Sequence, residues 1–271
     1  MENIQLVIFD WAGTTVDYGC IAPLDVFQKV FAEKQIDLSL EEVCKPMGMG
    51  KKDHIRTLLQ TENATKQWYE IYGRNWTEDD VEELFKNFNQ TLLKNLHQYC
   101  TPIDGVLDTV DILRKSGIKI GSTTGYTKEM MDIVVPESKK LGYEPDYLVT
   151  SEMVGTGRPH PFMIYENMRH FDIFPPKCVI KVGDTATDIK EGKNAGVWSV
   201  GIVKGSSASQ MTPEMEQNLS EAKKKVYYEK AVKVFKEAGA DFIIHSIKDL
   251  PQLIDQINVM LQRGNDDGKI L

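Results

Sequence analysis

Strand-like and helix-like stretches alternate along this chain of 271 residues from Gly105 onward, and no other feature restricts its fold as strongly. Short apolar runs bounded by turn residues predict strands, and the longer stretches between them show the periodicity of amphipathic helices. Such alternation is typical of a parallel sheet with helices on both faces. We therefore predict an α/β fold with a doubly wound, Rossmann-like core, whose strands are residues 6–9, 118–123, 147–150, 179–182, 198–203 and 242–245.

A long helical segment separates the first predicted strand from the rest of the core. Helical periodicity begins shortly after that strand, and no strand-like run interrupts it before residue 100. The sequences that begin at Ser39 and Thr77 have the spacing of capping boxes, which start helices. We predict an all-helical cap domain at residues 19–100, inserted into a catalytic core made of residues 1–18 and 101–271.

Three later segments have sequence features that predict their local structure. Pro136 falls within the helix predicted after Thr127, where it removes a hydrogen bond and should kink or shorten that helix. Within the lysine-rich stretch at residues 223–236, the run Lys223-Lys224-Lys225 is typical of a solvated helix face. The end of the chain, from Asn265 to Leu271, should be frayed.

Composition and charge exclude several classes of partner. The net charge of −8 and the pI near 5.3 argue against binding to nucleic acid or to an anionic membrane surface, although a few local cations can still capture a small anion. No run approaches the ~18 apolar residues of a membrane span, and the N-terminus lacks the pattern of a secretory signal. We expect a soluble, cytoplasmic protein whose cysteines are reduced and form neither a zinc site nor a disulfide framework: Cys20, Cys44, Cys100 and Cys178.

Carboxylates follow two of the predicted strands at the point where each strand ends. Asp10 comes directly after the first strand, and Asp184 and Asp188 follow the strand at residues 179–182. Because parallel strands open on the same edge of a sheet, Asp10 and Asp184 should meet there and hold Mg²⁺, a hard cation that prefers oxygen ligands. An Asp in this place can also attack phosphorus as a nucleophile. The alternative is that Asp184 and Asp188 only cap a helix.

Two further turns offer groups that bind anions. Thr124 lies in Gly121–Thr127, where a strand runs into a helix start, and hydroxyl and backbone N–H donors there form an anion site. Arg158 follows the third core strand and is stiffened by two nearby prolines, so it can neutralise the nucleophile and hold a phosphoryl group. The alternatives are a turn that only caps a helix and a solvated surface arginine.

One lysine of the helical segment stands out. The sequence around Lys51 is not a Walker A loop, because it lacks the first glycine of that motif and the Ser or Thr after Gly-Lys. Lys51 falls in the first turn of a helix beside Lys52, and both the positive helix end and the like charge favour a neutral amine. A neutral lysine can attack a carbonyl and form a Schiff base. The alternative is a pair of exposed surface lysines.

In order and over the whole core, these turns resemble the four signature motifs of the haloacid dehalogenase superfamily, at Asp10, Thr124, Arg158, and Asp184 with Asp188. Phosphatases of that superfamily usually read D-x-D-G-T at the first motif, where the second acid protonates the leaving oxygen. Ala12 stands in its place in this chain. Since general-acid help is worth roughly 10²–10⁴ in rate, an ordinary ester phosphatase would lose most of its activity with Ala12.

Within the superfamily, the sequences DWAGTT, PMG-x-x-K-x-DH and GSTTGYT resemble those of the phosphonoacetaldehyde hydrolases, or phosphonatases. The resemblance implies an α/β core with a helical cap, a Mg²⁺ cofactor and a homodimer formed through the cap. It also implies a role for each matching residue. Asp10 would be the nucleophile, Lys51 the imine lysine, and Thr124 and Arg158 further catalytic residues; the Ala12 carbonyl and Asp184 would be metal ligands supported by Asp188; His54 and Tyr126 would handle protons or position groups; Cys20, Met47 and Gly48 would lie near the substrate.

This resemblance accounts for Ala12. A protonated imine accepts the electron pair of a breaking P–C bond as an enamine, so no acid is needed beside the leaving atom. We therefore expect a hydrolase that converts phosphonoacetaldehyde to acetaldehyde and phosphate through a Lys51 imine and an Asp10 phosphoenzyme, with a small-molecule substrate and no nucleic-acid or membrane partner. The alternatives are a capped phosphatase or phosphomutase, which Ala12 disfavours, and a non-catalytic binding protein, which Asp10, Asp184 and Arg158 disfavour.

Overall fold

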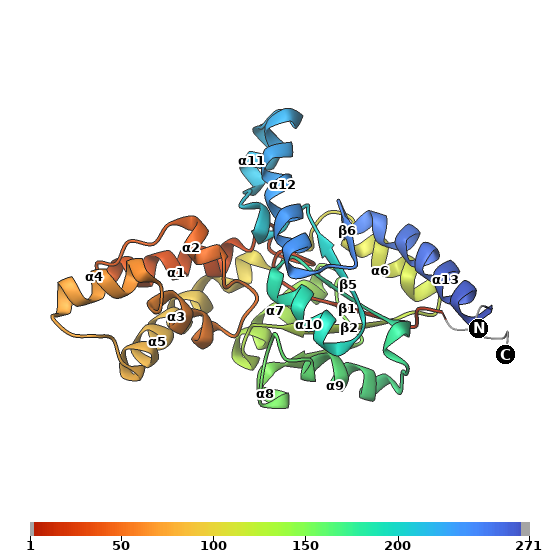
Figure 1. Cartoon of the computed structure of the whole chain (residues 1–271), viewed down its shortest axis with the longest axis horizontal. Coiled ribbons are helices and arrows are strands. Elements are labelled where there is room, and N and C mark those ends of the chain that lie inside the picture. The colour runs from red at the N-terminus through yellow and green to blue at the C-terminus, as the bar shows by residue number, and fades with distance from the viewer. Residues whose placement is uncertain (1–2, 267–271) are drawn as a thin grey trace.

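A six-stranded parallel sheet forms the centre of the computed structural model, which describes residues 3–266 of the chain (Figure 1). Its strand order is β3-β2-β1-β4-β5-β6, and every neighbouring pair is parallel, as predicted. The strands, each within one residue of its predicted bounds, are β1 (Leu6–Phe9), β2 (Lys119–Thr124), β3 (Tyr147–Thr150), β4 (Val179–Gly183), β5 (Trp198–Ile202) and β6 (Phe242–Ile244).

Helices connect the strands and cover both faces of the sheet. The core helices are α6 (Val106–Lys115), α7 (Lys128–Lys140), α8 (Ser151–Val154), α9 (Phe162–Phe171), α10 (Ala186–Ala195), α11 (Pro213–Asn218), α12 (Glu221–Ala238) and α13 (Leu250–Asp266). Side chains of the fully buried strand β1 alternate between the two faces. Val7 and Phe9 belong to the apolar cluster that includes α6 and α13, whereas Leu6 and Ile8 pack with α9.

The strand order places a switch point beside β1. The chain passes from β1 to β2 on one side of β1 and later returns to β4 on the other side. Phe9 lies in register with Val182, so the turns that follow β1 and β4 open next to each other. In sheets of this kind, ligands bind at the carboxyl ends of the strands where the order reverses.

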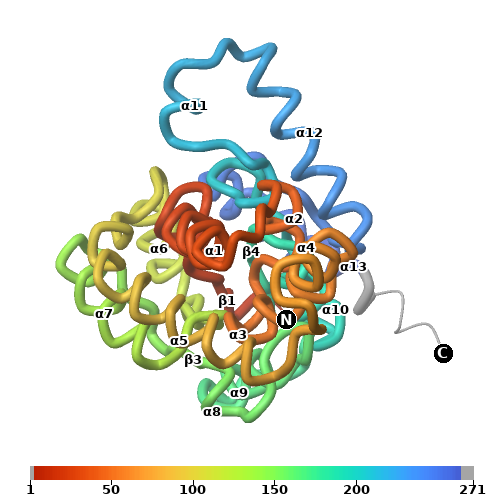
Figure 2. Tube along the Cα trace, turned by 90° about the vertical axis from the view of Figure 1, so that its left-hand side faces the viewer, coloured from red at the N-terminus to blue at the C-terminus, as the bar shows by residue number. Residues whose placement is uncertain are grey.

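Five helices between β1 and α6 gather at one end of the molecule, beyond the carboxyl ends of the strands (Figures 1 and 2). Stacked rings of Phe27 and Phe88, with centroids 4.3 Å apart, join the first of these helices to the last. The capping boxes predicted at Ser39 and Thr77 are both formed. The five helices are α1 (Ile21–Glu33), α2 (Leu40–Cys44), α3 (Lys51–Leu59), α4 (Glu62–Tyr72) and α5 (Glu78–Asn95), and we call this segment the cap.

Pro136 does not shorten its helix, although shortening was one of the two predicted outcomes. Helix α7 continues to Lys140 with Pro136 in its interior. A proline within a helix costs about 3 kcal/mol. The helix persists because its inner face is buried against the core through Met130, Met131, Val134 and Ser138.

The last third of the chain follows the prediction in part. Helix α11 and the start of α12 project from the rest of the core (Figure 2), whereas the end of α12 packs on α10 through Ala231 and Phe235. Lys223 and Lys225 are exposed as predicted, but Lys224 is partly buried and pairs with Glu216 and Glu221. Helix α13 continues to Asp266, past the point where we expected fraying to begin, and residues 267–271 lie outside the described part of the chain. None of the described helices is both long enough and apolar enough to span a membrane.

Candidate active site

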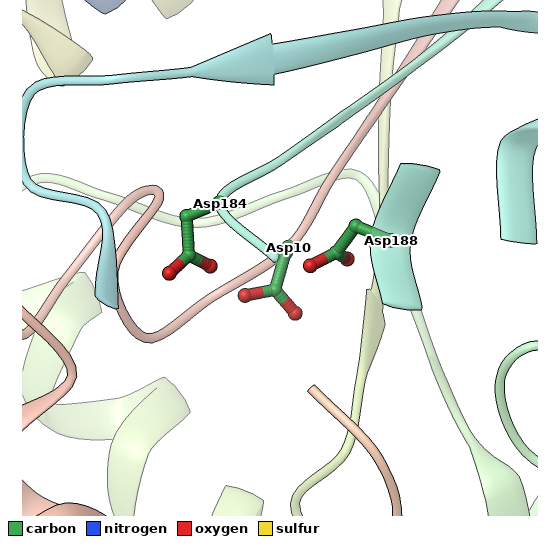
Figure 3. A group of neighbouring side chains, drawn as sticks. All are labelled: Asp10, Asp184 and Asp188. Atoms are coloured by element: carbon green, nitrogen blue, oxygen red, sulfur yellow. The ribbon is translucent and has the colours of Figure 1, made fainter. Parts of the chain in front are cut away.

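Three buried carboxylates meet where β1 and β4 end. Asp10 follows β1, and Asp184 and Asp188 come from the turn after β4 and the first turn of α10 (Figure 3). Each offers an oxygen atom, and the three atoms lie within 4.8 Å of one another. The structure thus brings together the acidic residues that the sequence placed on two separate turns.

Asp184 accepts hydrogen bonds only from neutral donors within the described part of the chain. Its Oδ1 accepts from the Thr14 hydroxyl at 3.2 Å, and its Oδ2 accepts from the Ser207 N–H at 2.9 Å and the Ser207 hydroxyl at 2.7 Å. Burial, together with the charges of Asp10 and Asp188, raises the pKa of Asp184 well above its usual value. A carboxylate held this way beside two others fits a hard divalent cation, which would supply the missing positive charge.

Arg158 connects the nucleophile candidate to the other carboxylates. Its Nη1 lies 2.7 Å from Asp10 Oδ1 and 2.9 Å from Asp188 Oδ1. Its Nε lies 2.8 Å from Glu191 Oε2, and its Nη2 donates to the Thr123 hydroxyl at 2.6 Å. Burial disfavours its charge, but these carboxylates outweigh burial and raise the pKa of Arg158. Arg158 is therefore a buried cation and not the solvated surface arginine of the alternative interpretation.

Lys51 enters the site from the cap. It is the first residue of α3 and only 4% exposed, and its Nζ lies 5.0 Å from the centre of the Tyr126 ring. Burial lowers the pKa of Lys51 below its usual value and so favours the neutral amine. Its neighbour Lys52 is 37% exposed and forms an ion pair with Glu82. The alternative of two surface lysines is wrong for Lys51 and holds for Lys52.

A small cavity between cap and core contains most of the predicted site residues. Its volume is about 20 Å³, which is roughly the space of one water molecule and too small for a larger ligand in this conformation. Two larger hollows, of about 610 and 720 Å³, adjoin α10 but reach none of Asp10, Lys51 or Arg158. The small cavity is lined by Asp10, Ala12, Cys20, Met47, Gly48, Lys51, Thr124, Gly125, Tyr126, Arg158 and Thr185.

The backbones of the cap and the core approach each other closely beside this cavity. Gly48 has a φ of +87°, and a Cβ atom there would lie 2.3 Å from the Thr185 hydroxyl oxygen. A Cβ atom at Gly125 would lie 2.6 Å from the carbonyl oxygen of Met49. Both positions therefore require glycine for the cap to close.

His54 lies behind Lys51 and does not line the cavity. Its Nε2 lies 3.0 Å from the carbonyl oxygen of Val43, which can only accept, so Nε2 carries the hydrogen. Nδ1 is then a free acceptor, since it has no hydrogen-bond partner among the described residues. Burial and the nearby charge of Lys51 hold the pKa of His54 well below its usual value, so the ring is neutral.

Tyr126 and Thr124 come from the turn after β2. The Tyr126 hydroxyl has no hydrogen-bond partner within residues 3–266, and burial raises its pKa well above the usual value. The Thr124 hydroxyl accepts a hydrogen bond from the Tyr126 N–H at 3.0 Å and so shapes this turn. Thr127 caps α7, as predicted by the alternative in which this turn only caps a helix. The same turn also lines the cavity, so capping is not its only contribution.

Sequence reasoning missed several buried groups around the site. Lys181 and Glu191 are fully buried and contact Asp188 and Arg158, respectively. The position of Lys181 inside the apolar run of β4 was a signal in the sequence that this lysine is unusual.

Asp17 is also buried, and no sequence pattern indicated it. Its carboxylate caps α1 by accepting hydrogen bonds from the N–H groups of Ile21 and Ala22 at 3.1 Å, and burial raises its pKa to about 7.

Comparisons with known proteins identify the family of this chain. The family model described as haloacid dehalogenase-like hydrolase matches residues 7–202. A phosphonoacetaldehyde hydrolase of Bacillus cytotoxicus is 47% identical over 94% of this chain and 97% of its own length. A bifunctional phosphonoacetaldehyde hydrolase/aminoethylphosphonate transaminase of Clostridioides difficile is 48% identical, and the match spans 40% of that longer protein.

A solved structure shows a similar fold. A phosphonoacetaldehyde hydrolase-like protein from Oleispira antarctica superposes with a TM-score of 0.93 at 32% identity, over 97% of this chain and 95% of that one. The likeness extends over the core and the cap together. The chain therefore belongs to the haloacid dehalogenase-like hydrolases and, within them, to the phosphonoacetaldehyde hydrolase family.

Proposed function

We propose that this protein hydrolyses phosphonoacetaldehyde to acetaldehyde and phosphate. One observation carries the proposal: a buried amine, Lys51, and a buried carboxylate, Asp10, line the same small cavity. An aldehyde that carries a phosphorus atom two bonds from its carbonyl carbon would engage both groups at once. The names of the relatives from Bacillus cytotoxicus and Clostridioides difficile support this substrate.

The reaction begins with the aldehyde. The neutral amine of Lys51 adds to the carbonyl carbon and releases water, which leaves a protonated imine. His54 Nδ1 is a free acceptor one helical turn from Lys51 and suits the removal of a proton from the attacking amine, directly or through water. Tyr126, whose hydroxyl is free and protonated, can donate to the carbinolamine oxygen as it leaves.

The P–C bond breaks in the next step. An Asp10 oxygen attacks phosphorus, and the bonding pair moves onto the carbon skeleton as the imine becomes an enamine. Arg158 Nη1 lies 2.7 Å from Asp10 and is placed to hold the phosphoryl oxygens during transfer. The enamine then takes a proton and is hydrolysed to acetaldehyde and free Lys51, while water cleaves the aspartyl phosphate.

Mg²⁺ fits the acidic end of the site. Asp10, Asp184 and the Ala12 carbonyl would hold it, with Asp188 supporting the metal or its waters. When bound, the ion would neutralise the phosphoryl group and reduce its repulsion of the anionic nucleophile.

We also propose the wider organisation that the family resemblance implies. Residues 19–100 form a cap domain, and the protein is a homodimer that associates through it. The exposed side chains of Tyr69, Ile71 and Tyr72 on α4 support such a contact, because they leave apolar surface on the cap. The acidic charge and the widely separated cysteines support a cytoplasmic location.

Release of phosphate and acetaldehyde from phosphonoacetaldehyde tests the proposed function. We expect equal amounts of both products in the presence of Mg²⁺ and none after the metal is chelated. Faster turnover of a generic phosphate ester would favour the capped phosphatase instead. Absence of turnover on both substrates would favour the non-catalytic binding protein.

Ala12→Asp should not improve phosphonate cleavage. Ala12 lines the cavity, so a carboxylate there would place another anion beside the phosphonate. An acid gains nothing at this position if the leaving carbon is stabilised as an enamine. We expect kcat/KM for phosphonoacetaldehyde to fall by about tenfold or more, because one lost favourable contact or one added repulsion of 1.4 kcal/mol has that effect. A faster variant on this substrate would contradict our account of Ala12.

A further inference from the structure

A buried ion pair lies behind the catalytic carboxylates. Lys181 on β4 and Glu191 on α10 are both fully buried, and the Lys181 Nζ lies 2.8 Å from Asp188 Oδ1 and 3.6 Å from Glu191 Oε2. Gly192 allows α10 to pack closely on the sheet, because a Cβ atom there would lie 2.7 Å from Ser199 Oγ and 3.2 Å from the Cβ of Lys181. Neither Lys181 nor Glu191 lines the cavity. They are therefore not substrate contacts.

Burying two charged side chains in a protein interior costs desolvation free energy. Apolar residues of similar volume are often as stabilising as a buried ion pair or more so. Lys181 lies within the otherwise apolar strand β4, where an aliphatic side chain would fit the pattern of its neighbours. The pair is therefore better explained by what it does to the site than by stability.

The hydrogen bonds of Arg158 show what the pair can do. Glu191 and Thr123 hold its Nε and Nη2, so these two contacts fix the plane of the guanidinium group. Nη1 lies 2.7 Å from Asp10 Oδ1 and 2.9 Å from Asp188 Oδ1, and it also donates a long hydrogen bond to the Gly48 carbonyl oxygen at 3.4 Å. A phosphoryl group on Asp10 must compete with Asp188 for this same nitrogen.

Lys181 relieves that competition. It contacts the same Asp188 oxygen, Oδ1, that Arg158 contacts. With Lys181 present, Asp188 keeps a cation when Nη1 turns toward the phosphoryl group. Without Lys181, Arg158 would be the only described cation on Asp188 and would be held there.

We propose that Lys181 and Glu191 are positioning residues for phosphoryl binding: Glu191 orients the guanidinium of Arg158, and Lys181 neutralises Asp188 so that Nη1 is free for the substrate. The proposal rests on the proposed function only in the identity of the substrate. Any phosphoryl group that binds beside Asp10 would depend on the same pair.

Orthophosphate binding, measured by calorimetry in the presence of Mg²⁺, tests the assignment. Lys181→Met should weaken orthophosphate binding at least about tenfold, as loss of a supporting contact commonly does. Lys181→Arg, which keeps the charge, should recover most of the affinity. The control is Glu216→Gln, which removes a partly buried charge that accepts from Tyr18 and Tyr228 outside the site and should leave orthophosphate binding unchanged.

The expected pattern in kinetics is a rise in KM for phosphonoacetaldehyde that exceeds the fall in kcat. Borohydride trapping of acetaldehyde on Lys51 should stay at the wild-type rate in Lys181→Met, because that reaction involves no phosphoryl group. If trapping fails in the wild-type protein as well, the proposed function fails, while the orthophosphate result still decides the role of Lys181.

Folding is addressed by a second variant. If Lys181→Met does not fold, Lys181→Met with Glu191→Gln removes the pair as a neutral unit and should fold, yet still bind orthophosphate at least about tenfold more weakly. A folded variant of either kind with wild-type orthophosphate affinity would overturn the assignment. So would a lowered melting temperature as the only change.

Discussion

Asp10→Asn should abolish release of phosphate from phosphonoacetaldehyde. The amide is nearly the same size as the carboxylate but is a far weaker nucleophile, and its nitrogen cannot accept from Arg158, which lies 2.7 Å from Asp10 Oδ1. Removal of a nucleophile that works with partner groups commonly costs a factor of 10³ or more, so we expect at least about that loss in kcat. Phosphate release by the purified variant is the measurement.

A separate assay shows whether the Asp10→Asn site is otherwise intact. The amine of Lys51 is unchanged, so borohydride should still trap phosphonoacetaldehyde on this variant. Asp25→Asn is a matched control, because Asp25 is an exposed carboxylate on α1 outside the cavity, and it should keep wild-type activity. Substantial phosphate release by Asp10→Asn would remove Asp10 from the role of nucleophile.

Much of the core was predictable, because its local and global signals agree. Most of the strands are short, mainly apolar runs bounded by turn residues, and burial on both faces of a parallel sheet favours such runs, although β2 (KIGSTT) is largely polar. The rule that parallel strands open on one edge also predicted that Asp10 and Asp184 meet. That β4 lies directly beside β1 in the strand order was not predictable from these runs, and this neighbourhood brings oxygen atoms of the two carboxylates within 4.8 Å of each other.

The groups that tune the site were harder to predict. The sequence suggests a reactive Lys51 through its helix position, but burial, which the structure shows, is the larger cause of its lowered pKa. His54 was identified by its place three residues after Lys51 in the sequence PMG-x-x-K-x-DH. Only its contact with Val43 identifies which ring nitrogen can accept a proton. Lys181 and Glu191 lie far apart in sequence from Arg158, and only the packing of α10 on β4 brings them to it.

Pro136 illustrates a different limit. Local propensity favours a break at this position, and the structure keeps the helix because one of its faces is buried. Tertiary packing overrides a local rule in this case, and a single sequence contains no direct signal of it. The same limit applies to the cap, whose close approach depends on what lies opposite Gly48 and Gly125.

Lys51→Arg should lose both the imine and the activity. Guanidinium stays protonated and therefore cannot add to an aldehyde. We expect no borohydride-trapped adduct and a fall in kcat of at least about 10³, since covalent catalysis through this residue would be lost entirely. Mass spectrometry of the digested wild-type protein should place the reduced adduct on the peptide that carries Lys51.

Lys52 provides the control for this prediction within the same helix. Successive residues of a helix are separated by about 100°, so two adjacent amines can face different surroundings. Lys51 is buried beside Tyr126, whereas Lys52 is 37% exposed and is paired with Glu82. Lys52→Arg should therefore retain most of the adduct and most of the activity. An adduct on Lys52, or full activity in Lys51→Arg, would overturn the imine assignment and favour the capped phosphatase.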